Sequence, residues 1–352
     1  MMSPGQLLLV SAITASLSWW GGHLLIRHAG KLGLVHQPNE RSSHQKIVPH
    51  GGGLGLVLAF SIALALLSIS GALDWRFTHC VLTAGCLLAA LGLWDDIAPL
   101  PATYRLLLQG GAIVFALSVP ASITSLPVLP LLLVYGTAAF FMLWWLNLFN
   151  FMDGIDGLAA SEALFICAAA VLLTAVSSPT PVNGLTVTML LLFAATAGFL
   201  LLNWPPARVF MGDVGSTFVG YLLAVFALDS VASGQLPLLV WLILGGVFWV
   251  DSTLTLLRRM VRGERWSSAH RSHAYQRYAA ALGRHYRSRG QSATLARANA
   301  HRLTTATVMT IDILWLLPLA WLVIIAPSWQ EAWLTLAWVP LVWLGLKSGA
   351  YE

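Results

Sequence analysis

The sequence predicts an all-α, polytopic integral membrane protein with about eleven transmembrane helices, and three observations support this fold class. Of the 352 residues, 58% are hydrophobic and only 9% are charged, whereas a soluble domain carries about 25% charged residues. Apolar runs of about twenty residues recur along the chain, which is the length that crosses a bilayer as a helix. Nearly all basic residues lie in the polar segments of one membrane face.

The predicted helices are the apolar runs between charged or Pro- and Gly-containing stretches such as "DDIAPLPATY", "SSPTPVNG" and "NWPPARVFMGDVG". In chain order they cover residues 5–26, 51–71, 77–94, 105–121, 130–148, 158–176, 185–202, 216–230, 236–257, 303–325 and 329–346. The first run lacks a basic region and a small-residue cleavage site, so we expect a retained span rather than a signal peptide. No repeat, soluble domain or low-complexity linker is visible, which indicates one membrane-embedded domain over residues 1–352.

The distribution of basic residues predicts the orientation of the chain. With the N-terminus outside, the cytoplasmic segments are the C-terminus and residues 27–50, 95–105, 149–157, 203–215 and 258–302. Of the 19 Lys and Arg residues, 18 lie in or at the edge of these segments, and Arg76 is the exception. Because cytoplasmic loops are enriched in Lys and Arg, we expect the N-terminus outside and the C-terminus inside.

Five aspartates lie at helix ends on this same cytoplasmic face: Asp95, Asp96, Asp153, Asp156 and Asp213. Any one of them could simply solvate a helix end. Asp153 and Asp156, however, have no Lys or Arg within forty residues of sequence, and neighbouring carboxylates raise the cost of ionising each other. A divalent cation relieves that repulsion, and hard oxygen ligands suit Mg²⁺, with Mn²⁺ as the alternative.

The turn around Asp213, at the start of the next predicted helix, favours the binding of an anion. Glycines and hydroxyl side chains surround Asp213 in "GDVGST", and a helix N-terminus presents free N–H groups to a phosphate. We therefore expect a metal–diphosphate pocket here. Phe210, three residues earlier, offers either a flat face to a nucleobase or an interfacial anchor.

Two basic segments face these acids. The loop "HQPNERSSHQKIVPHGGGLG", residues 36–55, is a candidate for holding phosphate, and "AHRSHAYQRY", residues 269–278, offers a phosphate clamp or proton carrier. The latter belongs to segment 258–302, which contains eleven Arg and no Lys. Such a cluster either lies at the interface and binds anionic lipid headgroups, or forms a helix and loop whose planar guanidinium groups recognise phosphates. Nucleic-acid binding is not expected, because the cluster is short and faces a membrane.

In family order, "PNERSSH" with "GGG", "DD", "NLFNFMDGIDGL", "FMGDVGS" and "HRSH" resemble the polyprenyl-phosphate N-acetylhexosamine-1-phosphate transferases of glycosyltransferase family 4. The resemblance covers roughly residues 36 to 273. It implies an enzyme of the bacterial cytoplasmic (inner) membrane with its active site facing the cytoplasm. The implied reaction transfers a sugar 1-phosphate from a UDP-N-acetylhexosamine to undecaprenyl phosphate and releases UMP, with Mg²⁺ as cofactor.

The resemblance also implies roles for matching residues. Asp95, Asp96 and His270 fall on catalytic positions, and Asp96 on a proposed base or nucleophile. Asp213 matches the principal metal ligand, with Asp153 beside it. The nucleotide-binding positions are Asn150, Asp153, Asp156 and Phe210, and the phosphate- or sugar-binding positions are Asn39, Arg41, Arg271 and His273.

Two departures from the family pattern bear on the substrate. His36 and Gln37 stand where an acid often precedes "PN", and the histidine loop reads "AHRSHAY" rather than a run of histidines. The latter resembles the branch that starts O-antigen or related lipid-linked glycans in lipopolysaccharide and cell-wall biogenesis. FucNAc and QuiNAc are therefore candidate sugars beside GlcNAc.

Other classes fit less well. A CDP-alcohol phosphatidyltransferase needs an Arg shortly after its DG pair and further spaced acids, which "DGIDGLAASEALFICAAA" lacks. A transporter or flippase places charges near the bilayer midplane, where only Asp251 and Asp312 are expected. The sequence leaves open the preferred sugar, single or double displacement, and whether the chain forms a homodimer.

Overall fold

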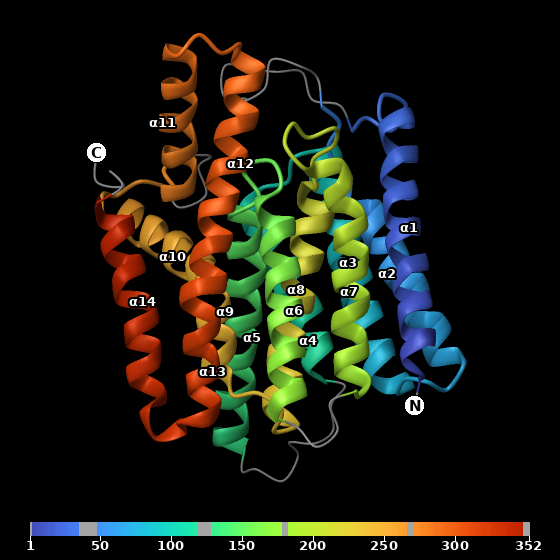
Figure 1. The fold of residues 1–352 in the computed structure, drawn as a ribbon. Helices are drawn as coiled ribbons and strands as arrows, with labels where there is room; N and C mark the ends of the chain where they lie inside the picture. The colour runs from blue at the N-terminus through green and yellow to red at the C-terminus, as the bar shows by residue number, and fades with distance from the viewer. Residues whose placement is uncertain (1, 35–47, 119–127, 178–181, 266–270, 348–352) are drawn as a thin grey trace.

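A computed structural model describes all residues except 1, 35–47, 119–127, 178–181, 266–270 and 348–352. The described residues form helices and turns, and no β-strand (Figure 1). The helices are α1 (Pro4–His28), α2 (Gly53–Ile69), α3 (Trp75–Ile97), α4 (Ala102–Ser118), α5 (Val128–Phe151), α6 (Leu158–Ser177), α7 (Gly184–Asn203), α8 (Gly212–Ala232), α9 (Leu238–Leu244), α10 (Gly246–Val261), α11 (Ala274–Ser288), α12 (Ala293–Ile311), α13 (Leu317–Ile325) and α14 (Gln330–Lys347). A π-helical turn, Asp312–Leu316, joins α12 to α13, and a 3₁₀ turn, Pro327–Trp329, precedes α14.

All eleven predicted segments are helical, but the number of membrane spans is smaller by length and composition. Seven helices of the described chain are long and apolar enough to cross a bilayer, or eight if the bent pair α9–α10 counts as one span. The apolar helices α2 and α4 have 17 residues each and reach only about 26 Å, against a hydrocarbon core of about 30 Å. The fold is a multi-pass membrane protein, and eleven spans remain a prediction.

Two predicted elements differ from the structure. The segment 236–257 is not one straight helix, because α9 and α10 meet at a bend of 77°. The segment 258–302, predicted as an interfacial cluster or as a helix and loop, contains parts of two helices beyond α10, namely α11 and the first ten residues of α12. The cap of α12 explains its early start: the Ser292 hydroxyl accepts a hydrogen bond from the backbone N–H of Leu295.

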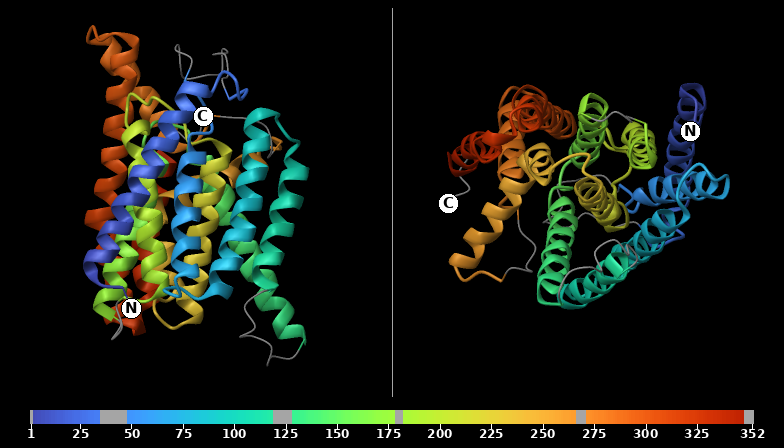
Figure 2. Two further views of the ribbon diagram at one scale, coloured as in Figure 1. Left: turned by 90° about the vertical axis from the view of Figure 1, so that its right-hand side faces the viewer. Right: turned by 90° about the horizontal axis from the view of Figure 1, so that it is seen from below.

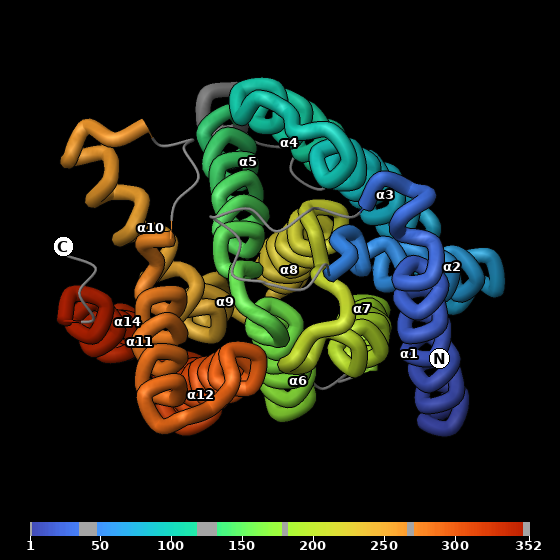
Figure 3. The backbone as a smooth tube through the Cα atoms, turned by 90° about the horizontal axis from the view of Figure 1, so that it is seen from above, coloured from blue at the N-terminus to red at the C-terminus, as the bar shows by residue number. Residues whose placement is uncertain are grey.

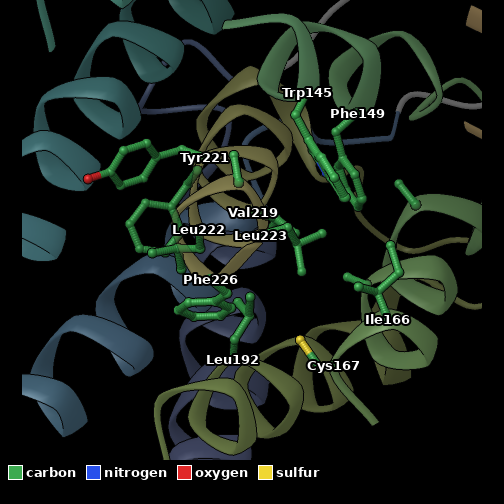
Figure 4. Packing of buried hydrophobic residues seen from close by; sticks show 14 of the residues in the cluster. Trp145, Phe149, Ile166, Cys167, Leu192, Val219, Tyr221, Leu222, Leu223 and Phe226 are labelled. Carbon is green, nitrogen blue, oxygen red and sulfur yellow. The ribbon is translucent and has the colours of Figure 1, made fainter. Parts of the chain in front are cut away.

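The helix α8 lies in the middle of the bundle. Seen from above, it is surrounded by α3, α5, α6, α7 and α9, and its main packing partners are α3 and α5 (Figure 3). Its side chains meet those of the neighbouring helices in a continuous apolar core that includes Trp145, Phe149, Tyr221 and Phe226 (Figure 4). A β-carbon at Gly220 would lie 2.9 Å from the Cα of Leu146, so glycine permits the close approach of α8 to α5.

The beginning of α1 and the C-terminal end of α14 lie at opposite ends of the bundle (Figure 2). From α1 to α8 successive helices alternate in direction, so the C-terminal ends of α3, α5 and α7 reach the same end as the beginning of α8. At this end α11 and the first part of α12 stand side by side and extend beyond the other helices (Figure 1). The polar segments of the predicted cytoplasmic face therefore gather at one end of the fold.

Candidate functional site

The first turn of α8 is held by a carboxylate from α3. The buried side chain of Asp96 accepts hydrogen bonds from the backbone N–H groups of Asp213, at 2.9 Å, and Val214, at 3.1 Å. These N–H groups have no partner within the helix, and an acid at this place also suits the helix dipole. A β-carbon at Gly92 would overlap the backbone of Asp213, so α3 and α8 meet here without room for a side chain.

Asp213 is the centre of a polar cluster formed by three helices. One of its carboxylate oxygens accepts a hydrogen bond from the amide of Asn150 at 2.9 Å, and the same amide nitrogen lies 2.9 Å from the Ser216 hydroxyl. The other oxygen lies 3.2 Å from the guanidinium of Arg105. The structure thus orients Asp213 from both sides.

Arg105 also forms an ion pair with Asp95 at 2.6 Å, and Asp95 accepts a hydrogen bond from the backbone N–H of Leu100. Arg105 therefore bridges Asp95 and Asp213. The sequence analysis assigned no role to Arg105. A signal was available, because Arg105 is the only Lys or Arg between Asp95 and Arg208.

Asp153 lies in the loop between α5 and α6, residues 152–157, and its side chain is half-buried. Burial raises the pKa of Asp153 well above its usual range, and the charges of Asp213, Asp96 and Asp156 raise it further. Four of the five predicted aspartates thus act on one another electrostatically although they come from separate segments. The predicted topology, which puts these aspartates on one membrane face, is consistent with this proximity.

Asp156 supports the same loop from its buried side. Its side chain is 1% exposed, accepts a hydrogen bond from the backbone N–H of Ala207 at 3.0 Å, and lies 3.3 Å from Nδ1 of His301. At Gly157, a backbone φ of +79° turns the chain into α6. Contact of Asp156 with a nucleotide stays a prediction, because the described carboxylate faces protein groups.

The sequence analysis missed the contact between Asp156 and His301. His301 lies on α12, 145 residues after Asp156, in no motif, and its Nδ1 accepts a hydrogen bond from the backbone N–H of Asp156 at 3.3 Å. Only the tertiary fold reveals this contact. Arg105 supplies positive charge next to Asp95 and Asp213, and a metal beside the aspartates stays a prediction.

His301→Ala tests this support. The variant would leave the buried backbone N–H of Asp156 without its imidazole acceptor, which costs about 1–3 kcal/mol. We expect a lower midpoint of thermal unfolding in detergent and a parallel loss of function. The exposed His285 provides the control, since His285→Ala should leave the midpoint unchanged. An unchanged midpoint in His301→Ala would show that the pair does not stabilise the loop.

Phe210 lies next to the glycines that precede α2. Its backbone N–H donates to Pro49 at 2.9 Å, its carbonyl accepts from Gly52 at 2.8 Å, and its half-buried ring meets His50 edge-on with centroids 5.1 Å apart. A β-carbon at Gly53 would overlap Gly215 at the start of α8. The glycine run therefore brings the start of α2 against the start of α8.

The start of α11 is fixed to the bundle by Asp251 of α10. The carboxylate of Asp251 accepts from the backbone N–H groups of Ala274 and Tyr275, and lies 3.4 Å from Nδ1 of the buried His273. The Tyr275 hydroxyl donates to the carbonyl of Phe151 at 2.9 Å, and burial raises the pKa of Tyr275, which keeps the donor protonated. Asp251 is thus a helix cap rather than an isolated charge.

The remaining predicted residues are placed differently. Arg271 is exposed and lines a cavity beside loop 152–157. Asn39, Arg41 and His270 lie outside the described residues. Asp312, in the π-helical turn, is buried and interacts with Glu162 of α6, so this charge also has a neighbour within the protein.

The carboxylates fit a metal that completes its shell with a substrate. Within the described ranges no three His, Cys, Asp or Glu side chains form a metal cage. Asp213 of α8, Asp153 of loop 152–157 and Asn150 of α5 instead provide a small set of oxygen donors at the end of the bundle. This set suits Mg²⁺, which binds through one or two carboxylates together with phosphate and water oxygens.

Comparisons with known proteins agree with this geometry. Residues 78–231 match the family described as Glycosyl transferase family 4. The chain is 30% identical to the "Probable undecaprenyl-phosphate N-acetylglucosaminyl 1-phosphate transferase" of Bacillus subtilis over 71% of each chain. It is 29% identical to the "Decaprenyl-phosphate N-acetylglucosaminephosphotransferase" of Mycobacterium tuberculosis (strain H37Rv), over 77% of this chain and 75% of the relative.

A third relative is the "Undecaprenyl-phosphate alpha-N-acetylglucosaminyl 1-phosphate transferase" of Escherichia coli K12, 26% identical over 70% of this chain and 69% of the relative. The matched family segment, 78–231, contains Asp95, Asp96, Asn150, Asp153 and Asp213, and thus most of the polar cluster described above. The chain therefore belongs to glycosyltransferase family 4, among the polyprenyl-phosphate N-acetylhexosamine-1-phosphate transferases.

Proposed function

We propose that this protein transfers an N-acetylhexosamine 1-phosphate from a UDP-sugar to undecaprenyl phosphate, releasing UMP, at the cytoplasmic face of the bacterial inner membrane. The single observation that carries this proposal is the placement of Asp213 at the start of α8. There it is oriented by Asn150 and Arg105 and lies within electrostatic reach of Asp153. The printed names of the relatives support a polyprenyl-phosphate acceptor.

The proposed roles follow from these contacts. Asp213 and Asp153 would hold Mg²⁺, which when bound neutralises charge on the donor diphosphate and on departing UMP. Asn150 keeps the Asp213 carboxylate directed at the site, and Arg105 fixes the relative position of Asp95 and Asp213. Phe210 offers its half-buried ring to the uracil. Phosphoryl transfer of this kind depends mainly on such positioning and charge stabilisation.

The chemical step needs little from a protein base. An oxygen of the acceptor phosphate attacks the phosphorus next to the sugar, and the bond from that phosphorus to the UMP oxygen breaks. A phosphate monoester has its second pKa near about 6, so most of the acceptor is a dianion at neutral pH. Asp96, whose carboxylate accepts two backbone N–H groups, is therefore proposed to act by holding the first turn of α8.

The helix α10 is proposed to guide the lipid acceptor. The bend of 77° directs α10 away from the bundle axis, and Figure 3 shows it passing outward near α5 and α14. Leu257, Met260 and Val261 are exposed on its last turns, with the half-buried Arg258 and the exposed Arg262 beside them, whereas Arg259 is buried and paired with Glu264. An apolar surface next to basic groups suits an acceptor with a long hydrocarbon tail and a phosphate head.

For the donor, we propose UDP-N-acetylhexosamines of the GlcNAc, FucNAc or QuiNAc type, with the product used for O-antigen or a related lipid-linked glycan. The motif "AHRSHAY" supports the 6-deoxy sugars, and the relatives' names support GlcNAc. In the sequence, Trp266, Ala269 and Tyr275 stand near His270, which favours a partly apolar sugar pocket, and such a pocket discriminates one small group by only about 10- to 200-fold. We therefore expect several of these donors to be used, with 6-deoxy sugars preferred.

The test is transfer of sugar label into lipid. Membranes containing the protein are incubated with undecaprenyl phosphate, Mg²⁺ and each sugar-labelled UDP-N-acetylhexosamine, and the lipid phase is extracted. We expect label in the lipid phase for at least one donor. Absence of label in the lipid for every donor would refute the transferase proposal.

The proposed orientation has its own prediction. Reporter fusions after residues 50, 157 and 290 are expected to lie in the cytoplasm, because 18 of the 19 basic residues then satisfy the positive-inside rule. Reporter activity typical of the periplasm at any of these three places would contradict a cytoplasmic active site.

A further inference from the structure

A cavity of about 690 Å³ lies between α11, the first part of α12 and loop 152–157. Gly154 and Ile155 form one wall, and His301 lies in another. Five arginines line the same cavity: Arg271, Arg277, Arg284, Arg287 and Arg297. The established family assignment does not explain why so many guanidinium groups face one space.

Close packing of α11 against α12 creates this arrangement. A β-carbon at Gly283 would lie 4.0 Å from the β-carbon of Ala300, and Ala296 and Ala300 are buried. Small residues at the contact let the two backbones approach, so the long side chains on either side border the cavity. The two helices project beyond the end of the bundle, as Figure 1 shows, where molecules from the aqueous phase arrive.

The lining of the cavity is basic, and Asp156, next to Ile155 of the lining, acts on Arg297. None of the residues lining it is Asp or Glu, and α11 contains no acid in its 15 residues. Arg277, Arg284 and Arg287 are seven and three positions apart, so they share one helix face over about 15 Å. Neither Arg284 nor Arg287 forms an ion pair with any residue that the structure describes. Guanidinium groups so arranged favour a ligand with more than one negative charge, and their planar donors suit phosphate oxygens.

The position of the cavity beside the acidic cluster favours the soluble donor diphosphate over the lipid acceptor as its ligand. Gly154 in its wall directly follows Asp153, whose carboxylate belongs to the acidic cluster with Asp213 and Asp96. A soluble diphosphate approaching those carboxylates is repelled, whereas a positive surface at the entrance attracts it and raises its local concentration. The lipid acceptor differs, because it is already confined to the membrane.

We propose that this arginine cavity is a capture site for nucleoside diphosphates, which binds the diphosphate of the donor before the donor reaches the carboxylates. This inference rests on the proposed function and extends it. It assigns Arg284 and Arg287 to the binding of donor and not to the chemical step. The site accelerates productive encounter, and its contribution falls as salt screens the charges.

The test compares the double variant Arg284→Gln/Arg287→Gln with the full-length parent in vesicles of neutral phospholipid. We expect KM for the UDP-sugar to rise about 10-fold with kcat unchanged, and kcat/KM to depend less on ionic strength. Arg289→Gln is the matched control, because Arg289 is an exposed arginine at the end of the same helix and does not line the cavity. The control should keep the KM and salt dependence of the parent.

Three results would overturn the capture site. The first is a double variant with the KM and salt dependence of the parent. The second is a fall in kcat at unchanged KM, which would indicate a role in chemistry or folding. The third is a defect seen only when anionic phospholipid is added to the vesicles, which would indicate that these arginines bind lipid headgroups.

The affinity for UDP distinguishes a failure of the capture site from a failure of the proposed transferase function. At low salt, the affinity of the parent for UDP is expected to exceed that of the double variant by about 5-fold or more. Equal affinities would refute the capture site even if transfer occurs. Conversely, a parent that binds UDP in this way but transfers no sugar phosphate to lipid would refute the proposed function alone.

Discussion

Asp213→Asn is expected to lower turnover on the order of 10³-fold at every Mg²⁺ concentration, or to shift the Mg²⁺ requirement steeply upward. The substitution keeps the size of the side chain but removes the negative charge. It thereby weakens the proposed metal ligand and leaves the amide of Asn150 and the guanidinium of Arg105 without an anionic partner at this position. The measurement is the initial rate of lipid labelling across a Mg²⁺ titration.

The same helix offers a matched control. Asp229 lies near the other end of α8 and is half-buried, so Asp229→Asn makes the same chemical change away from the cluster. Its rate and Mg²⁺ response should equal those of the parent. Near-normal turnover and metal response in Asp213→Asn would show that the metal assignment is wrong.

Asp96→Asn is expected to have the second-largest effect, a loss of about 10²-fold in turnover with little change in the Mg²⁺ requirement. The carboxylate accepts the N–H groups of Asp213 and Val214 at the start of α8, and an amide can accept only through its oxygen. The turn that carries Asp213 is then held less firmly. A lower midpoint of thermal unfolding should accompany the loss, because a helix cap contributes about 0.5–2 kcal/mol.

The pH dependence separates this capping role from the base implied by the family resemblance. A cap is required at every pH, so the rate of Asp96→Asn relative to the parent should stay constant across the pH range. A base is required only where the acceptor must lose a proton. A ratio that approaches one at high pH, together with an unchanged unfolding midpoint, would favour the base and contradict the cap.

The sequence was sufficient to predict most helices, because each apolar run of a membrane protein must satisfy its backbone hydrogen bonds internally. It was not sufficient for the break between α9 and α10. The apolar run continues through Gly245 and Gly246 without a charged residue, and the bend is supported by tertiary contacts such as the hydrogen bond from the Trp338 indole to the carbonyl of Leu242.

The helix α11 shows a second limit of prediction from the sequence. Its many arginines left open an interfacial cluster or a helix and loop, and did not give the bounds of a helix, although Ala, Arg, Gln and Leu are all good helix formers. What fixes the helix is its first turn, where Asp251 of α10 accepts two backbone N–H groups. From the sequence, Asp251 fitted either a transporter-type charge near the midplane or a polar contact between helices, and its capping role was not visible because its partners come from 23 and 24 residues later in the chain.

For the site, the motifs identified the anionic residues but not the side chains that hold them in place. Asp95, Asp153 and Asp213 were recognisable because their spacing is fixed by local turns and by the predicted topology. Arg105 and His301 could not be assigned in the same way. Arg105 contacts Asp213 of α8, and His301 contacts Asp156 in loop 152–157, and only the packing of α4 and α12 brings these partners together.

The most direct test of the central claim follows the phosphorus. The protein is incubated with undecaprenyl phosphate, Mg²⁺ and a UDP-N-acetylhexosamine that carries ³²P only on the phosphate next to the sugar. A sugar-1-phosphate transferase moves this phosphorus into the lipid and releases an equal amount of UMP, and Asp213→Asn should abolish both signals. Release of UDP with ³²P left in the aqueous phase, or no cleavage of the donor, would contradict the account.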